Sequence, residues 1–463
     1  MLVITSALAG IPCGFVPPPP APLPELPKTT GEPGVRDGFG VFETWETEHF
    51  AIKWGPALSP TPEHLALLEE DLERVWDGQI DALGWLPPAG AEAFKLNVYL
   101  ASTGGGAPEI DFDGGYVWTD EEGFPYIALY PTCLEVYDDP FASFTNVELV
   151  AHEFNHTLQI RDSAFSFNRY GPYLWEATAS WVVPETLGTA PSRGWGRFLL
   201  YPHVSLDMWA LFGDDPSREG RQYDTALFLH YLTAQRGLGP DFLRDAWEQA
   251  TPEDEPLHYL DRELDGGLRP VYLDFARQYA LGDHDLGDLY LTGMDELTNW
   301  GGVPDDRITV SVPSAGAPWG RPPPSLRPQA WSWNHLTWRS PGTGSIVVSF
   351  EAEPEGTRGT ASDLTGLVVH ERDGRFTDAS LGAPVEVLRD DVVHLLVVST
   401  PLNPDIDERF GYTYGFAPDV EVEVAPLASE TVREGCSCAT QGPESLGALV
   451  LAVLFGVRRA RRA

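Results

Sequence analysis

The sequence is poor in cysteine and in basic residues, and it lacks a hydrophobic run long enough to span a membrane. Only 4 of its 463 residues are Cys, which excludes a disulfide-based scaffold. Only 30 Lys and Arg oppose 69 Asp and Glu, and a surface with the resulting net charge of −39 repels the phosphates of nucleic acids. The apolar run 446–457 is shorter than the roughly 20 residues of a membrane-spanning helix. We therefore expect no nucleic-acid partner, and contact with a membrane only through the C-terminal tail.

Apolar residues, by contrast, are plentiful. Hydrophobic residues make up 43% of the chain and aromatic residues 11%, so the chain can bury sizeable cores and is not disordered. Its 46 Gly and 42 Pro indicate many turns and loops. Its length favours two or three domains.

The N-terminal region combines a signal-like start with a proline-rich stretch. Ala7-Leu8-Ala9 matches the small-residue pattern at which secretory signals are cleaved, but the basic n-region and the longer apolar h-region are missing. We favour a truncated signal in residues 1–15 over ordinary N-terminal sequence. Residues 16–34 form an extended Pro-rich linker, so that residues 1–36 precede the first domain.

The C-terminal residues 431–463 contain Cys436 and Cys438, then the apolar run 446–457, then four Arg. Cationic residues after an apolar run stop translocation. This arrangement resembles the MYXO-CTERM sorting signal. The resemblance implies export, processing near Cys436 and delivery to the cell surface or outer membrane, with release from the cell as a further outcome. A local disulfide or half of a zinc knuckle is the less favoured alternative, because the chain has no second Cys pair.

Between these ends, residues 37–300 alternate strand-like and helix-like patterns. Alternating and β-rich runs predict strands at 49–54, 95–100, 115–118 and 125–130, the last two as a hairpin or as paired edge strands. Apolar residues at helical spacing predict a helix over 62–84, and the pattern is helical from about 140 to about 290. We therefore expect an α+β fold for this domain.

Residues 301–430 have a different pattern, with short β-branched and aromatic runs separated by turns. Their spacing predicts an all-β sandwich domain, which we interpret as a packing or stalk module in preference to a module that binds glycans or other surface partners. The predicted strands are 308–312, 331–338, 345–350, 367–371, 392–399, 412–416 and 420–424.

A helix over 146–158 carries the motif H-E-x-x-H. Thr145 and Glu148 form a capping-box pattern at its start. His152 and His156 are four positions apart, so both imidazoles project from one face and can bind one zinc ion. Glu153 adjoins the first ligand and can reach a water on the metal. Two surface histidines on a capped helix are the alternative reading of the motif.

A third ligand, Glu176, lies 20 positions after His156. Pro172 can open a second helix at its first turn, and that helix could return the Glu176 carboxylate to the metal. Two His and one Glu with an open fourth position form a catalytic rather than a structural zinc set. We expect one Zn²⁺ held by His152, His156 and Glu176.

These residues resemble the gluzincin metallopeptidases, the thermolysin-like and peptidase-MA group. That family has H-E-x-x-H followed some 20 residues later by Glu, often in the context W-x-E-G-x-A. This chain has Trp175-Glu176-Ala177-Thr178-Ala179, with Trp directly before the Glu and Ala in place of Gly. The resemblance covers roughly residues 44–290. It implies a zincin-like metallopeptidase domain, with a mixed sheet and active-site helices, over residues 37–300.

The residue types predict the roles of the remaining groups. Glu153 is the general base that takes a proton from the attacking water. The resemblance implies an oxyanion donor on a downstream helix, and Tyr223 is the candidate there, with His230 as a weaker one.

The sequence offers further candidates for roles at or near the site. Ser180, Asp224 and Asp162 are candidates to hold the ligand imidazoles. Strand 125–130 could be the edge strand that pairs with an extended substrate, although an ordinary core strand fits it equally well. Cys133 is expected to be a buried free thiol.

The sequence therefore predicts an exported zinc-dependent metalloendopeptidase that acts on peptides or proteins. Two alternatives remain. One is a zinc hydrolase acting on cell-wall peptide. The other is a surface-anchored binding protein with an inactive metallopeptidase domain, against which the intact set of His152, Glu153, His156 and Glu176 counts.

Overall fold

The computed structural model describes residues 33–36, 39–40, 42–110, 114–138, 145–162, 164–165, 171–210, 218, 220–292, 308–309, 319–402 and 407–418. All of these residues belong to one compact unit that ends at Glu423. The expected signal, most of the Pro-rich linker, and the tail with Cys436 and Cys438 lie outside the described residues. Within the described ranges, no helix combines the length and the apolar composition needed to cross a membrane.

The N-terminal sheet has five strands in the order β1-β2-β3-β5-β4. Strands β2, β3 and β5 are parallel, and the two outer strands β1 and β4 pair antiparallel with their neighbours. The strands are β1 (Glu43–Glu46), β2 (Phe50–Trp54), β3 (Leu96–Leu100), β4 (Gly115–Thr119) and β5 (Pro125–Leu129).

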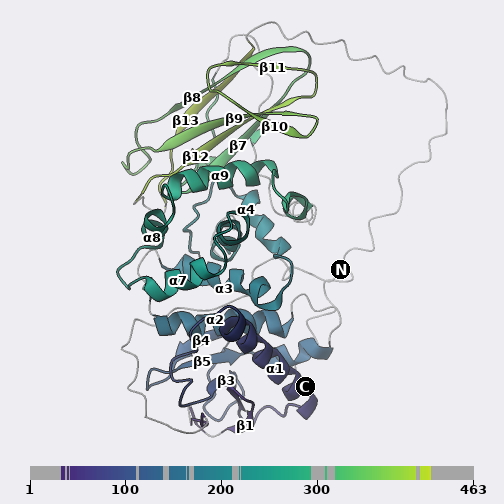
Figure 1. Cartoon of the computed structure of the whole chain (residues 1–463), viewed down its shortest axis with the longest axis vertical. Coiled ribbons are helices and arrows are strands. Elements are labelled where there is room, and N and C mark those ends of the chain that lie inside the picture. The colour runs from purple at the N-terminus through teal and green to yellow at the C-terminus, as the bar shows by residue number, and fades with distance from the viewer. Residues whose placement is uncertain are drawn as a thin grey trace, which may run out of the picture. The chain divides into compact units, whose positions relative to one another are not determined.

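Helices α1 (Pro62–Trp76) and α2 (Asn146–Asp162) cover one face of this sheet (Figure 1). Alternate strand residues such as Val98 and Ile127 join the main hydrophobic cluster with both helices. The residues between them, such as Tyr99 and Tyr126, form a separate cluster on the opposite face. The sheet therefore supports α2, the helix that carries H-E-x-x-H.

A group of helices follows α2 in the chain. Helix α3 packs against α2 and also contacts α5 and α6, so it lies at the centre of this group. The helices are α3 (Pro172–Leu187), α4 (Arg197–Leu200), α5 (Arg221–Asp224), α6 (Ala226–His230), α7 (Asp241–Gln249), α8 (Pro256–Glu263) and α9 (Leu268–Leu281).

The C-terminal part contains two further sheets, in the orders β10-β9-β12-β7-β6 and β11-β8-β13. Side chains from both sheets, among them Trp338 and Val348, share one hydrophobic cluster. The strands are β6 (Ile308–Thr309), β7 (Ser332–Arg339), β8 (Gly344–Ala352), β9 (Leu364–Arg372), β10 (Arg375–Ala379), β11 (Pro384–Val387), β12 (Val392–Ser399) and β13 (Tyr412–Pro418).

Helix α9 contacts β7 and β12, and the main hydrophobic cluster extends from the helices into Trp331 and Trp333 (Figure 1). Apolar packing is therefore continuous across the domain boundary predicted near residue 300.

The α+β class predicted from the sequence is confirmed, and four of the first five strands lie where alternation placed them. Two expectations need correction. The predicted helix 62–84 is α-helical only to Trp76, and a π-helical segment η1 (Asp77–Ala82) continues it. Strand β5 pairs antiparallel with β4, which confirms the predicted hairpin, and it also pairs with β3. It is therefore the core strand of the two alternatives and not an edge for substrate, since the edge strands of this sheet are β1 and β4. Alternation shows that a segment is a strand but carries no information on its neighbours.

Candidate metal centre

Two helices bring the candidate ligands together. Helix α2 begins at the predicted capping box, where the Glu148 carboxylate accepts hydrogen bonds from the Thr145 backbone N–H at 2.9 Å and from its hydroxyl at 3.1 Å. Helix α3 begins with Pro172 at its first turn, as predicted. The packing of α2 against α3 sets Glu176 opposite the face of α2 that presents His152 and His156.

The ligand atoms of these three residues lie within 4.8 Å of one another. Glu176 Oε2 is 3.1 Å from His152 Nε2 and 3.5 Å from His156 Nε2, and the two imidazole centroids are 4.8 Å apart. All three side chains are completely buried. No other cluster of three potential metal ligands occurs among the described residues. The triad could therefore hold one metal ion.

Electrostatics at the triad favour a cation. Burial lowers the pKa of His152, which keeps that imidazole neutral and able to donate a lone pair. Burial alone would raise the pKa of Glu176, but hydrogen bonds with His152 and His156 outweigh it and lower that pKa. The ionised carboxylate in turn raises the pKa of His156 against the effect of burial. A carboxylate that stabilises a proton on His156 also stabilises a metal cation at that place.

The second carboxylate oxygen of Glu176 also indicates a place for a metal ion. Glu176 Oε1 is buried and has no hydrogen-bond partner among the described residues. A buried carboxylate oxygen left in this way costs about 1–3 kcal/mol or more, because the group has lost its hydration. A metal ion bound by the Glu176 carboxylate would remove that cost.

Glu153 lies on α2 beside His152 and is also completely buried. Its side chain packs against Gly115 at the start of the edge strand β4. A Cβ atom added to Gly115 would lie 2.9 Å from Glu153 Cγ and 3.0 Å from Glu153 Oε1. The position of Glu153 therefore requires a residue without a side chain at 115, a dependence for which the sequence offers no signal beyond the Gly itself.

Tyr223 lies on the short helix α5 next to the triad. Its ring centroid is 6.0 Å from that of His152, and its side chain is buried. Two other residues of α5, Arg221 and Asp224, are anchored by hydrogen bonds. The Arg221 guanidinium donates to the carbonyls of Phe198 and Val204, each at 2.8 Å, and Asp224 accepts from Arg197 Nε at 2.9 Å. These contacts hold the Tyr223 ring beside His152, where the sequence analysis expected an oxyanion donor.

One of the candidate ligand imidazoles, that of His156, has Gln159 as its partner, which the sequence analysis missed. Gln159 Oε1 lies 2.7 Å from His156 Nδ1. The position of Gln159 three residues after His156 on a helix was an available signal, because residues so spaced are neighbours. The candidate Asp224 instead forms an ion pair with Arg197, and burial raises its pKa to about 6. For Asp162, burial and the charge of Glu248 raise the pKa to about 7.

The remaining candidates lie apart from the triad or have other roles. The His230 ring lies 6.0 Å from that of Trp195, and His230 Nδ1 is 4.0 Å from Glu185 Oε1. Ser180 is half-buried on α3. Cys133 is a buried free thiol, as predicted, and burial raises its pKa to about 12. A thiol with so high a pKa is unreactive at neutral pH.

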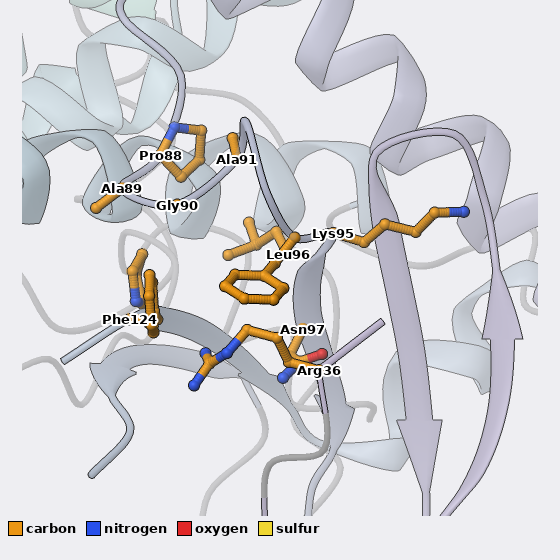
Figure 2. A pocket seen from close by; sticks show the side chains of 11 residues that line it. Arg36, Pro88, Ala89, Gly90, Ala91, Lys95, Leu96, Asn97 and Phe124 are labelled. Atoms are coloured by element: carbon orange, nitrogen blue, oxygen red, sulfur yellow. The ribbon is translucent and has the colours of Figure 1, made fainter. Parts of the chain in front are cut away.

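A pocket that none of the triad residues lines opens beside the starts of β3 and β5 (Figure 2). The Arg36 guanidinium lies over the rings of Phe124 at 4.0 Å and Phe94 at 5.2 Å. The same group forms ion pairs with Asp120 at 2.6 Å and Glu122 at 2.7 Å. Its charge is therefore already balanced, and the pocket offers no clear chemistry of its own.

No known protein family model matches this chain, and no curated protein matches it. The interpretation of the centre therefore rests on its own residues.

Proposed function

We propose that this chain is a zinc-dependent metallopeptidase that hydrolyses peptide bonds. The observation that carries the proposal is the buried triad of His152, His156 and Glu176, whose ligand atoms lie within 4.8 Å of one another. Two imidazole nitrogens and one carboxylate suit zinc, and three protein ligands leave a fourth position for water or substrate.

The neighbouring residues supply the other groups that peptide hydrolysis needs. Zinc, when bound, supplies the Lewis acid that makes a water molecule nucleophilic near neutral pH. Glu153 accepts a proton from the attacking water and passes it to the leaving amine. The Tyr223 hydroxyl donates a hydrogen bond to the oxyanion that develops on the substrate carbonyl.

The fold is compatible with this proposal. We infer that the first sheet and helices α1 to α9 form a zincin-like domain. Strands β1 and β2, helix α1, strand β3 and the strand pair β4 and β5 precede the H-E-x-x-H helix, and this order includes the leading strand, first helix and strand pair that the resemblance to gluzincins implies. We also infer that the two C-terminal sheets form a β-sandwich, since both contribute to one hydrophobic cluster.

The first experiment measures the zinc content of the purified protein beside a His156→Ala variant. We expect one zinc per chain, lost in the variant. Casein hydrolysis is then compared for the wild type, Glu153→Gln and the control Glu185→Gln. The control changes a partly buried carboxylate on α3, the helix that also carries Glu176. Glu153→Gln should abolish hydrolysis and retain zinc, whereas Glu185→Gln should retain both.

Unchanged turnover in Glu153→Gln would refute the proposed mechanism. Release of cell-wall fragments without digestion of casein would instead favour cell-wall peptide as the substrate. A folded wild type without metal would favour a binding protein with an inactive peptidase domain.

We also propose export to the cell surface, on the basis of the tail with Cys436 and its resemblance to a sorting signal. Fractionation of cells that express the full chain tests this, with Cys436→Ser as the comparison. Wild-type protein in the soluble cell interior would contradict export.

A further inference from the structure

Gln159 makes two hydrogen bonds in the interior between α2 and α3. Its side chain is completely buried. Its Oε1 atom lies 2.7 Å from His156 Nδ1, and its Nε2 atom donates to the Trp175 carbonyl at 3.1 Å. Trp175 directly precedes Glu176 in α3. One amide therefore connects the side chain of one candidate ligand to the backbone beside another.

The chemistry of these partners determines which way the amide points. A backbone carbonyl can only accept a hydrogen bond, so the group facing Trp175 must be the NH₂ of Gln159. The Oε1 atom then faces His156, and because that oxygen can only accept, His156 Nδ1 must carry a proton. The lone pair of the neutral imidazole is thereby left on Nε2, the atom nearest to Glu176.

Trp175, whose carbonyl accepts the hydrogen bond from Gln159, is itself held in place. The Trp175 indole Nε1 donates to the Phe165 carbonyl at 3.2 Å, and its ring packs edge-on against Trp247 with centroids 5.0 Å apart. Both rings are buried. The carbonyl that orients Gln159 therefore belongs to a residue whose buried side chain is fixed by a hydrogen bond and by ring packing.

We propose that Gln159 is a positioning residue for the metal centre. Its amide holds His156 in the tautomer that presents Nε2 to the metal, and it ties the helices that carry His156 and Glu176 at one spacing. This inference rests on the proposed metal-dependent function.

Two substitutions of Gln159 distinguish its hydrogen bond with His156 from its hydrogen bond to the Trp175 carbonyl. Gln159→Leu removes both hydrogen bonds at similar volume. Gln159→Glu keeps an acceptor for His156 but loses the donor to the Trp175 carbonyl. The matched control is Gln329→Leu, because Gln329 is another buried amide, whose Oε1 accepts from the Ser205 N–H at 3.0 Å.

The readout is the dissociation constant for zinc, measured by competition with a chromophoric chelator, beside the absorption spectrum of the cobalt-substituted protein. We expect Gln159→Leu to weaken zinc binding about 10- to 100-fold and to alter the cobalt spectrum. Gln159→Glu should recover much of the affinity, and Gln329→Leu should bind zinc as the wild type does. Wild-type affinity in Gln159→Leu, or an equal loss in Gln329→Leu, would overturn the inference.

A measurement on the wild type alone keeps the test independent of how well the variants fold. Nuclear magnetic resonance of metal-free protein containing isotope-labelled histidine, recorded at a pH high enough for the imidazoles to be neutral, reports which ring nitrogen of each imidazole carries the proton. His156 should carry it on Nδ1, and a proton on Nε2 of neutral His156 would overturn the inference. Zinc binding without peptide hydrolysis would refute only the proposed function, whereas hydrolysis with unchanged affinity in Gln159→Leu would refute only the role of Gln159.

Discussion

Glu153 owes its position to a neighbouring residue that has no side chain. The general base must hold one carboxylate oxygen within hydrogen-bond reach of the water that it deprotonates. Helix α2 fixes the backbone of Glu153, and Gly115 on β4 leaves the space into which its side chain extends. Under the proposed function, the ability of Glu153 to act as general base depends on the distance between α2 and the edge strand β4 as well as on the carboxylate.

Gly115→Ala should impair hydrolysis while leaving the metal bound. The new methyl group would displace the Glu153 carboxylate, and a shift of about 1 Å in a catalytic group can lower kcat about 100-fold. Steady-state kinetics and zinc content check this. The control is Gly34→Ala, because a Cβ there has no atom within 4 Å. Full activity in Gly115→Ala would show that Glu153 is not confined by the strand.

Tyr223→Phe should lower kcat by roughly 100- to 1,000-fold, the usual effect of removing one oxyanion donor. KM and zinc content should change little, because the hydroxyl acts only when charge develops on the substrate. Tyr231→Phe is the control, since it also removes one buried hydroxyl, which in the wild type donates to Asp274 at 2.6 Å. Equal kinetics of the wild type and Tyr223→Phe would remove Tyr223 from the mechanism.

The candidate site shows which residues can be predicted from sequence. Helical geometry alone predicts that His152 and His156 share a face. Adding Glu176 required the helix start at Pro172 and a family resemblance. Gln159 was within reach of prediction as the helical neighbour of His156, but its second hydrogen bond, to the Trp175 carbonyl, depends on how α2 packs against α3. Gly115 escaped prediction because its role depends on the spacing between α2 and β4, which is not a local property.

At the scale of elements, the π-helical segment η1 joins α1 to the helix of the metal centre. The buried Gln79 donates from Nε2 to the Ala151 carbonyl at 2.7 Å and accepts from Asn155 Nδ2 at 3.1 Å. Ala151 directly precedes the H-E-x-x-H motif, and Asn155 is its fourth residue. Segment η1 therefore contacts α2 through buried hydrogen bonds at the motif itself.

Gln79→Leu should reduce the free energy of unfolding by about 1–3 kcal/mol, because it leaves the buried Asn155 amide without this partner. Urea unfolding checks the value. The double variant with Asn155→Leu should be less destabilised than the sum of the two single variants, since each removes the same hydrogen bond. Additive losses would mean that the two amides are not coupled.

His284, just after α9, should make stability depend on pH. Its Nδ1 atom accepts from the Leu286 N–H at 3.3 Å, its ring stacks on Tyr279 with centroids 4.1 Å apart, and burial lowers its pKa to about 4. The folded state thus disfavours protonation that the unfolded state accepts near pH 6.5. This contribution is complete above about pH 6.5 and is lost as the pH falls toward 4.

The check compares the wild type with His284→Gln, which cannot titrate. The difference between their unfolding free energies should fall by about 1–2 kcal/mol from neutral pH to about pH 4.5, after a discount for the partial exposure of the ring. All other titrating groups are common to both proteins. Parallel pH profiles would contradict the assignment.

Strand order illustrates the limit of prediction at this scale. Strands β4 and β5 were correctly predicted as a neighbouring pair, but the sequence left open whether β5 lies at an edge or inside the sheet. Whether β5 lies at an edge depends on its pairing with β3, more than twenty positions earlier in the chain. Such pairing is decided by packing of the whole sheet against α1 and α2, which no local pattern records.

At the scale of the whole chain, the main hydrophobic cluster of the helices continues into side chains of β7 and β12, beside the separate cluster that the two C-terminal sheets share. The Tyr272 hydroxyl on α9 donates to the Trp331 carbonyl, which also accepts from the Leu206 N–H at 3.0 Å. The Trp333 ring lies 5.7 Å from both Phe198 and Phe275. The sequence predicted the change from helices to strands near residue 300, but not this packing, because aromatic residues far apart in the chain supply it.

This continuous packing predicts that the helices and the C-terminal sheets unfold together. Trp333→Ala should remove about 3–5 kcal/mol of stability, as truncation of a buried Trp usually does. Urea unfolding followed by far-ultraviolet circular dichroism and by loss of bound zinc should give one coincident transition in the wild type, and in Trp333→Ala both signals should move together to lower urea. Leu388→Ala, at a side chain that is 46% exposed, should shift neither. If Trp333→Ala separates the two signals, the metal-binding helices fold independently of the sheets, and the contacts of α9 with β7 and β12 contribute little to the stability of the centre.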